Sequence, residues 1–172
     1  MRGTTKVSSA EHERRRKIDS DQEYEMTTSP FSPNVLEAIA TCFALDVPRL
    51  GLLVISSSGP VNRAVYELRR LGVNAQGLNS ENTLDKATLL VGTTATTRGI
   101  DLEGLTHVFI IGIPEGPQVN GKSVDAYIHL AGRVGRFGNT GRVITVVCTN
   151  LEGDKMVRIL RPTRPVLFPY FT

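Results

Sequence analysis

Tryptophan is absent from this 172-residue sequence, and aromatic residues make up only 6% of it. So few aromatic side chains argue against a surface that binds nucleic-acid bases by stacking. The sequence also lacks any apolar run approaching the roughly 20 residues that a membrane-spanning helix requires. Only two cysteines are present, Cys42 and Cys148, too few for a zinc cluster or a disulfide framework. We therefore expect buried free thiols and a reducing, intracellular compartment, with cytoplasm, nucleus and organelle left open.

Neither sign of charge dominates, since 20 Lys and Arg residues stand against 17 Asp and Glu residues, a net charge of +3. This mildly basic balance permits a nucleic-acid partner without requiring one. The Arg-Arg-Arg-Lys run at residues 14–17 has no apolar stretch behind it, which disfavours a secretory signal. Residues 1–30 show no amphipathic period and are interpreted as a flexible polar lead-in, with a short edge strand at 24–27 as the alternative. We expect one ordered domain at 31–155 and a tail at 156–172.

Apolar runs and amphipathic segments alternate from residue 32 onward. Ser32 and Pro33 are typical of a helix start, with Ser at the N-cap and Pro at the first helical position. Helices are expected at 34–45, 62–71 and 124–131, and strands at 50–55, 88–92, 106–111 and 142–148. This alternation predicts an α/β domain with a largely parallel sheet. Ligands of such sheets bind at the carboxyl ends of the strands, so the loops there are the candidate site.

Two arginines three residues apart follow the last expected helix, within the run Gly-Arg-Val-Gly-Arg at 132–136. Arg133 and Arg136 would lie on one face, and their guanidinium groups can stabilise charge on a phosphoryl group. Considered alone, the run equally fits a helix end capped by Gly132, with arginine placed favourably against the helix dipole.

A cluster of hydroxyl side chains follows the strand expected at 88–92 and leads to Asp101. Threonine hydroxyls at a strand's carboxyl end can donate to phosphate oxygens, and an acidic residue can accept from a ribose hydroxyl. A polar turn, with Asp101 capping the next turn, is the alternative.

Together these segments resemble the C-terminal RecA-like domain of the DEAD-box RNA helicases. Residues 97–101 (Thr-Arg-Gly-Ile-Asp) are similar to the fifth motif of that family, and residues 129–136 to the sixth. Residues 53–58 are similar to the fourth motif, an apolar strand that ends in hydroxyl residues. The resemblance covers roughly residues 32–150. It implies a three-layer sandwich with a mostly parallel central sheet and helices on both faces.

The resemblance also implies roles for individual residues. Arg133 and Arg136 match the arginines that reach the γ-phosphate of ATP, which the other lobe holds. Asp101 matches the carboxylate that meets the ribose, and Arg98 and Gly99 match residues that shape the loop between the ATP and RNA sites.

The remaining matches concern RNA and the second lobe. Ser58 and Thr93 match hydroxyl positions that touch the RNA backbone, so that RNA binding would be independent of sequence. His129 matches a position in the network between the two lobes. ATP and Mg²⁺ would be held mainly by an N-terminal RecA-like lobe in cis or in trans, so this chain alone is expected not to hydrolyse ATP and to hold no metal.

Three departures from the family pattern bear on function. Leu130 stands where the sixth motif usually has its first arginine, and Thr94 where an Asp is usual. The segment 72–89 is short and has no clear counterpart of the helix that brings a Gln and an Arg to RNA. These departures leave open a non-catalytic, degenerate helicase lobe that serves as an RNA-binding or assembly module.

A third hypothesis is a self-contained P-loop NTPase, because residues 116–123 (Gly-Pro-Gln-Val-Asn-Gly-Lys-Ser) fit the P-loop pattern. Pro117 argues against it, since a phosphate cradle is built from successive backbone N–H groups and proline has none. The strand expected at 142–148 also does not end in an Asp that could hold magnesium. We therefore interpret the segment as a connector into the sixth motif.

Overall fold

The computed structural model describes residues 9–56, 58–78, 87–112, 122–134 and 140–147. By its internal contacts the chain divides into two units, Met1–Pro30 and Phe31–Thr172, each of which is described by itself. No helix within the described ranges is long and apolar enough to cross a membrane.

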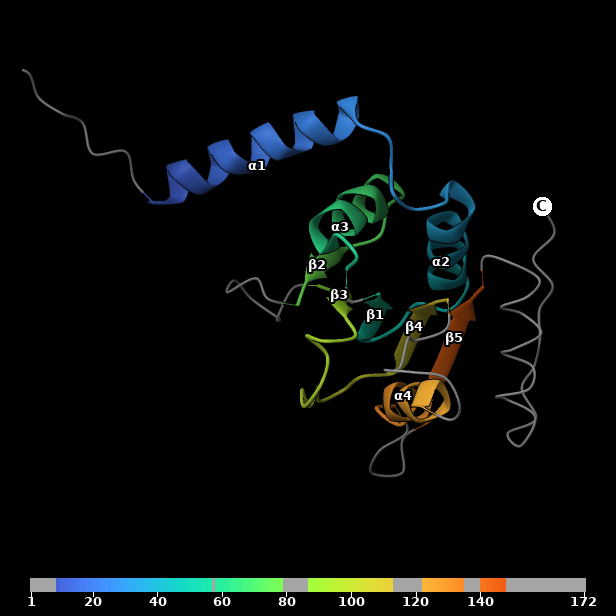
Figure 1. The fold of residues 1–172 in the computed structure, drawn as a ribbon. Helices are drawn as coiled ribbons and strands as arrows, with labels where there is room; N and C mark the ends of the chain where they lie inside the picture. Colours follow the sequence, from blue (N-terminus) through green and yellow to red (C-terminus); the bar gives the residue numbers. More distant parts are fainter. Residues whose placement is uncertain (1–8, 57, 79–86, 113–121, 135–139, 148–172) are drawn as a thin grey trace, which may run out of the picture. The chain divides into compact units, whose positions relative to one another are not determined.

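Within residues 9–30, the described part of the first unit, there is one helix, α1, Ser9–Met26 (Figure 1). The alternative of a short strand at 24–27 is therefore wrong, and the absence of an amphipathic period did not mean the absence of a helix. Glu, Arg, Lys and Gln are good helix formers. Opposite charges four residues apart, as in Lys17 and Asp21, further support a helix that has no apolar face.

The second unit is built on a five-stranded sheet in the order β2-β3-β1-β4-β5, with every pair parallel. The strands are β1 Gly51–Ile55, β2 Ala75–Gly77, β3 Leu89–Thr93, β4 His107–Ile111 and β5 Arg142–Val146. The helices are α2 Pro33–Leu45, α3 Val61–Arg70 and α4 Lys122–Ala131. The predicted α/β class and parallel sheet are confirmed, and each predicted helix and strand is present within a few residues of its expected bounds.

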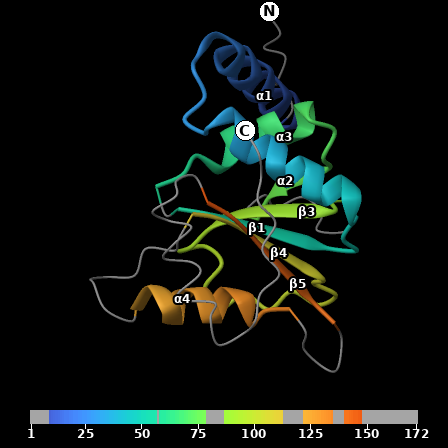
Figure 2. The ribbon, with the colours of Figure 1, turned by 90° about the vertical axis from the view of Figure 1, so that its right-hand side faces the viewer.

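Helices α2 and α3 cover one face of the sheet and α4 covers the other (Figure 2). Leu53, Val91 and Phe109 point toward α2 and α3, whereas Leu52, Leu90 and Val108 belong to the cluster that includes α4 residues. Because the strands are buried on both faces, their sequences are continuous apolar runs rather than alternating ones. The expected three-layer sandwich is confirmed.

Local details differ from the prediction in three places. Ser32 lies at the N-cap of α2 and Pro33 begins the helix, but the Ser32 hydroxyl makes no capping hydrogen bond. Strand β2 was not predicted, because three residues are too few to show a period. Cys42 is a free thiol but only half-buried, and that burial raises its pKa; Cys148 lies outside the described residues.

Candidate functional site

The candidate site begins where β1 and β3 end side by side. Ile55 and Thr93 are register partners, and the backbone N–H of Thr94 donates to the carbonyl of Ile55 at 3.1 Å. Ser58 is exposed in the loop that follows β1. The loops that carry Ser58 and residues 94–101 thus leave the sheet from adjacent strand ends, as expected for a parallel α/β sheet.

The threonines after β3 bind one another in a compact turn. The backbone N–H of Thr93 donates to Oγ1 of Thr96 at 2.8 Å, and the N–H of Thr96 donates back to Oγ1 of Thr93 at 3.1 Å. Thr97 donates to the carbonyl of Thr93 through both its N–H, at 3.0 Å, and its hydroxyl, at 2.9 Å. This reciprocal pattern is that of a capping box, and it satisfies the backbone groups of the turn.

Burial of Thr93 limits its predicted contact with RNA, and the sequence did not reveal this burial. Its side chain is only 7% exposed, and its hydroxyl is engaged by Thr96. A direct contact with RNA stays a prediction, and the low exposure of Thr93 limits access to its hydroxyl. Thr94, half-buried, and Arg98, exposed, lie closer to the surface of the same loop.

The end of the loop bends through a glycine. Gly99 has φ +73°, a conformation that only glycine adopts without strain. Arg98, before it, and Asp101, after it, are exposed, whereas Ile100 is half-buried. The loop thus presents a cation and a carboxylate at the surface, while the backbone of Ile100 turns toward the protein.

Arg133 meets this loop from the end of α4. Backbone bonds from Gly132 to Ile128 at 2.8 Å and from Arg133 to Leu130 at 3.3 Å continue the helical turn past Ala131. The guanidinium of Arg133 is half-buried and donates to the main-chain carbonyl of Ile100. The structure thus joins the segments that resemble the fifth and sixth motifs. Arg136 lies outside the described residues.

Two neighbours of Arg133 on α4 have opposite environments. His129, the predicted inter-lobe residue, is exposed. Leu130 is only 6% exposed and belongs to the cluster of core residues between α4 and the sheet. Leu130 therefore has a packing role here, which gives a physical reason for an apolar residue at this departure from the family pattern.

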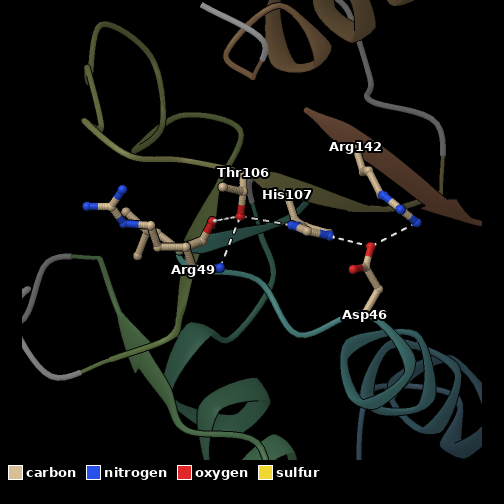
Figure 3. A network of polar contacts seen from close by, with 6 residues as sticks. Asp46, Arg49, Thr106, His107 and Arg142 are labelled. Atoms are coloured by element: carbon tan, nitrogen blue, oxygen red, sulfur yellow. Dashed lines mark hydrogen bonds and ion pairs between the residues drawn. The ribbon is translucent and has the colours of Figure 1, made fainter. Parts of the chain in front are cut away.

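A polar network that the sequence did not predict lies at the opposite, amino-terminal edge of the sheet (Figure 3). Oδ2 of Asp46, just after α2, lies 2.8 Å from Nε2 of His107 and 2.9 Å from a terminal nitrogen of Arg142. Nδ1 of His107 lies 2.9 Å from the hydroxyl of Thr106. The hydrogen bond from His107, and after it the charges of Arg142 and His107, lower the pKa of the Asp46 carboxyl.

This network ties the end of α2 to the first residues of β4 and β5. Its residues lie after α2 and at the starts of β4 and β5, not at the carboxyl ends of the strands, so we assign it to the fold rather than to the candidate site. Within the described ranges, no group of three His, Cys, Asp or Glu side chains could hold a metal ion.

Comparison with known proteins gives the class of this domain. The helicase conserved C-terminal domain matches residues 74–138. The C-terminal domain of the DEAD-box protein Dbp5 superposes with a TM-score of 0.62 and 18% identity, over 79% of this chain and 82% of that one. The DEAD-box protein SrmB of E. coli, solved with RraA, gives a TM-score of 0.57 at 20% identity over 75% and 79% of the two chains. The fold and the match together define a RecA-like C-terminal helicase domain.

The sequence relatives of the chain are ATP-dependent RNA helicases. The ATP-dependent RNA helicase CshA of Limosilactobacillus reuteri is 34% identical over 127 residues, which cover 64% of this chain and 24% of CshA. The ATP-dependent RNA helicase DDX4 of Mus musculus is 38% identical over 78 residues, 44% of this chain and 10% of DDX4. These matches support the interpretation of the chain as the C-terminal RecA-like domain of a DEAD-box RNA helicase. The chain spans about a quarter or less of the length of these relatives.

The P-loop-like segment at 116–123 falls inside the matched helicase domain, which favours its interpretation as a connector. Residues 113–121 lie outside the described residues, and Lys122 is the first residue of α4. Residues 79–86, in the shortened segment, also lie outside the described residues.

Proposed function

We propose that this chain is the C-terminal lobe of an ATP-dependent RNA helicase and supplies Arg133 and Arg136 to the γ-phosphate of ATP. The observation that carries the proposal is the bond from the Arg133 guanidinium to the carbonyl of Ile100. It brings Arg133 to the loop that carries Asp101, the proposed ribose partner. If Arg133 served only to stabilise the end of α4, a bond to this loop would not be expected.

The proposed role of Arg133 and Arg136 is electrostatic stabilisation of the transferred phosphoryl group. As a phosphoryl group is transferred, negative charge spreads over its equatorial oxygens, and a planar guanidinium can donate to two of them at once. An arginine supplied from a separate element increases the rate by about 10³ to 10⁵ in comparable systems. Mg²⁺, proposed to be held mainly by the N-terminal lobe, would neutralise phosphate charge when bound.

RNA is proposed to cross the loops at the ends of β1 and β3. Ser58 is exposed there and would donate to the RNA backbone, while contact of RNA with Thr93 would be limited by its low exposure. Contacts to phosphate and sugar carry no base information, so binding should not depend on sequence and should weaken as salt rises. Dbp5 of S. cerevisiae has been solved with RNA and ADP BeF3.

The proposal is tested by joining the chain to the N-terminal part of CshA from Limosilactobacillus reuteri. We expect RNA-stimulated ATP hydrolysis from the joined protein, none from the chain alone, and loss of stimulation in Arg136→Ala. Arg70→Ala is the matched control, because Arg70 is an exposed arginine at the end of α3. Stimulated turnover that survives Arg136→Ala would contradict the proposed role. A joined protein that binds RNA but hydrolyses no ATP would instead indicate a non-catalytic lobe.

A further inference from the structure

We propose that Gly99 is a positioning residue for Arg133 and that it acts through the main-chain carbonyl of Ile100. The inference rests on the proposed function, because it concerns how Arg133 is aimed at phosphate. It adds a residue that touches neither ATP nor RNA in this role.

The direction of the Ile100 carbonyl depends on the bend at Gly99. Gly99 has φ +73°, and the next residue turns its carbonyl toward the end of α4, where Arg133 donates to it. A residue with a Cβ would be strained in this conformation and would favour negative φ. Because Gly99 directly precedes Ile100, a change in φ there redirects the carbonyl that holds the guanidinium.

A carbonyl partner suits an arginine that must later meet a phosphate. A guanidinium has five N–H donors, so a single bond to the Ile100 carbonyl fixes the orientation of its plane without using all of them. Such prior alignment matters because electrostatic stabilisation is largest when the donors need no reorganisation during the reaction.

The surroundings of Gly99 allow a clean test of the backbone effect. A Cβ added at Gly99 would meet no atom within 4 Å, so Gly99→Ala introduces backbone strain without a steric clash. Gly104 is a matched control: its φ is +79°, and the nearest atom to an added Cβ is Nε of Arg49 at 3.9 Å. Arg49 lies two residues before the first residue of β1 and takes no part in the bond between Arg133 and Ile100.

The first readout uses the chain by itself. In ¹⁵N-labelled protein, the Arg133 Nε–H signal, assigned by its loss in Arg133→Lys, reports how strongly rotation of the guanidinium is restrained. We expect restrained rotation in the wild type and in Gly104→Ala, and faster, averaged rotation in Gly99→Ala. Both alanine variants should lose a similar few degrees of melting temperature. An unchanged Arg133 signal in Gly99→Ala, or an equal change in Gly104→Ala, would overturn the inference.

The second readout uses the protein joined to the CshA N-terminal part. A displacement of about 1 Å in a catalytic group can lower the rate about 10²-fold, so kcat in Gly99→Ala should fall by that order while Gly104→Ala stays near wild type. Equal kcat in the two variants would contradict the positioning role. Failure of the proposed function has a different signature, because Arg136→Ala would then leave RNA-stimulated turnover intact whatever the Arg133 signal shows.

Discussion

His107, the first residue of β4, bonds through Nε2 to Oδ2 of Asp46 at 2.8 Å, although the two residues are 61 positions apart in the chain (Figure 3). Arg142 binds the same carboxylate oxygen at 2.9 Å. The carboxylate therefore links three elements of the domain. Its effect on stability should depend on pH.

The hydrogen bond from His107 and the positive charges nearby lower the pKa of Asp46 in the folded chain. A group whose pKa is lower when folded stabilises the fold above its unfolded pKa, about 3.9 for Asp, and loses this contribution as pH falls through the folded pKa. The melting temperature of Asp46→Asn should thus lie below wild type at pH 6, and the gap should narrow below about pH 4. Glu37→Gln, at an exposed position of α2, controls for loss of a negative charge. A gap that stays constant down to pH 3 would be inconsistent with this assignment.

Leu130 should behave as a core residue. Its side chain is 6% exposed, whereas that of Ile128, two residues earlier on α4, is 57% exposed. Leu130→Ala should lower the free energy of unfolding by about 2–5 kcal/mol. Ile128→Ala should change it by less than about 0.5 kcal/mol. Chemical denaturation of the two variants measures this difference, and equal effects would place Leu130 outside the core.

The hydroxyl of Thr97 should stabilise the turn after β3. This side chain is 1% exposed and donates to the carbonyl of Thr93 at 2.9 Å. Thr97→Val keeps the shape but removes the donor, and it should lower the free energy of unfolding by about 0.5–1.5 kcal/mol. Thr41→Val, at an exposed position of α2, is the control. Urea unfolding of both variants is the measurement, and a neutral Thr97→Val would show that the N–H of Thr97 alone suffices.

RNA binding by the joined protein should depend on salt and not on sequence. Because the proposed contacts are to phosphate and sugar, two unrelated single strands of equal length should bind with affinities within a few-fold of each other. The logarithm of each binding constant should fall linearly with the logarithm of the salt concentration, with the same slope for both strands. Fluorescence anisotropy at several salt concentrations measures this. A strong preference for one sequence would point to base contacts that the proposal does not include.

Most of the central fold follows from the sequence because continuous apolar runs mark strands buried on both faces. Helix α1 was missed because its stability comes from helix-forming charged residues rather than from an apolar face. Strand β2 was missed because three residues show no period. In the site, the resemblance of residues 97–101 and 129–136 to two helicase motifs led us to expect a nucleotide loop beside Arg133, and the structure brings Arg133 and Ile100 together.

Other features could not be derived from local pattern. The bond between Asp46 and His107 joins residues 61 positions apart, so only the folded chain reveals it. The threonine cluster after β3 indicated donors for phosphate, but Thr93, Thr96 and Thr97 use hydroxyls within their own turn. Local hydrogen bonds of this kind compete with ligand contacts, and residue type alone does not decide between them.

The central claim is that the guanidinium of Arg133 serves the Ile100 carbonyl and the γ-phosphate together. Lysine keeps the charge but lacks the planar fork that could hold both partners, so Arg133→Lys tests this claim most directly. The measurement is single-turnover ATP hydrolysis by the joined protein with saturating RNA. A rate about 10³-fold or more below wild type is predicted, and a rate near wild type would contradict the account.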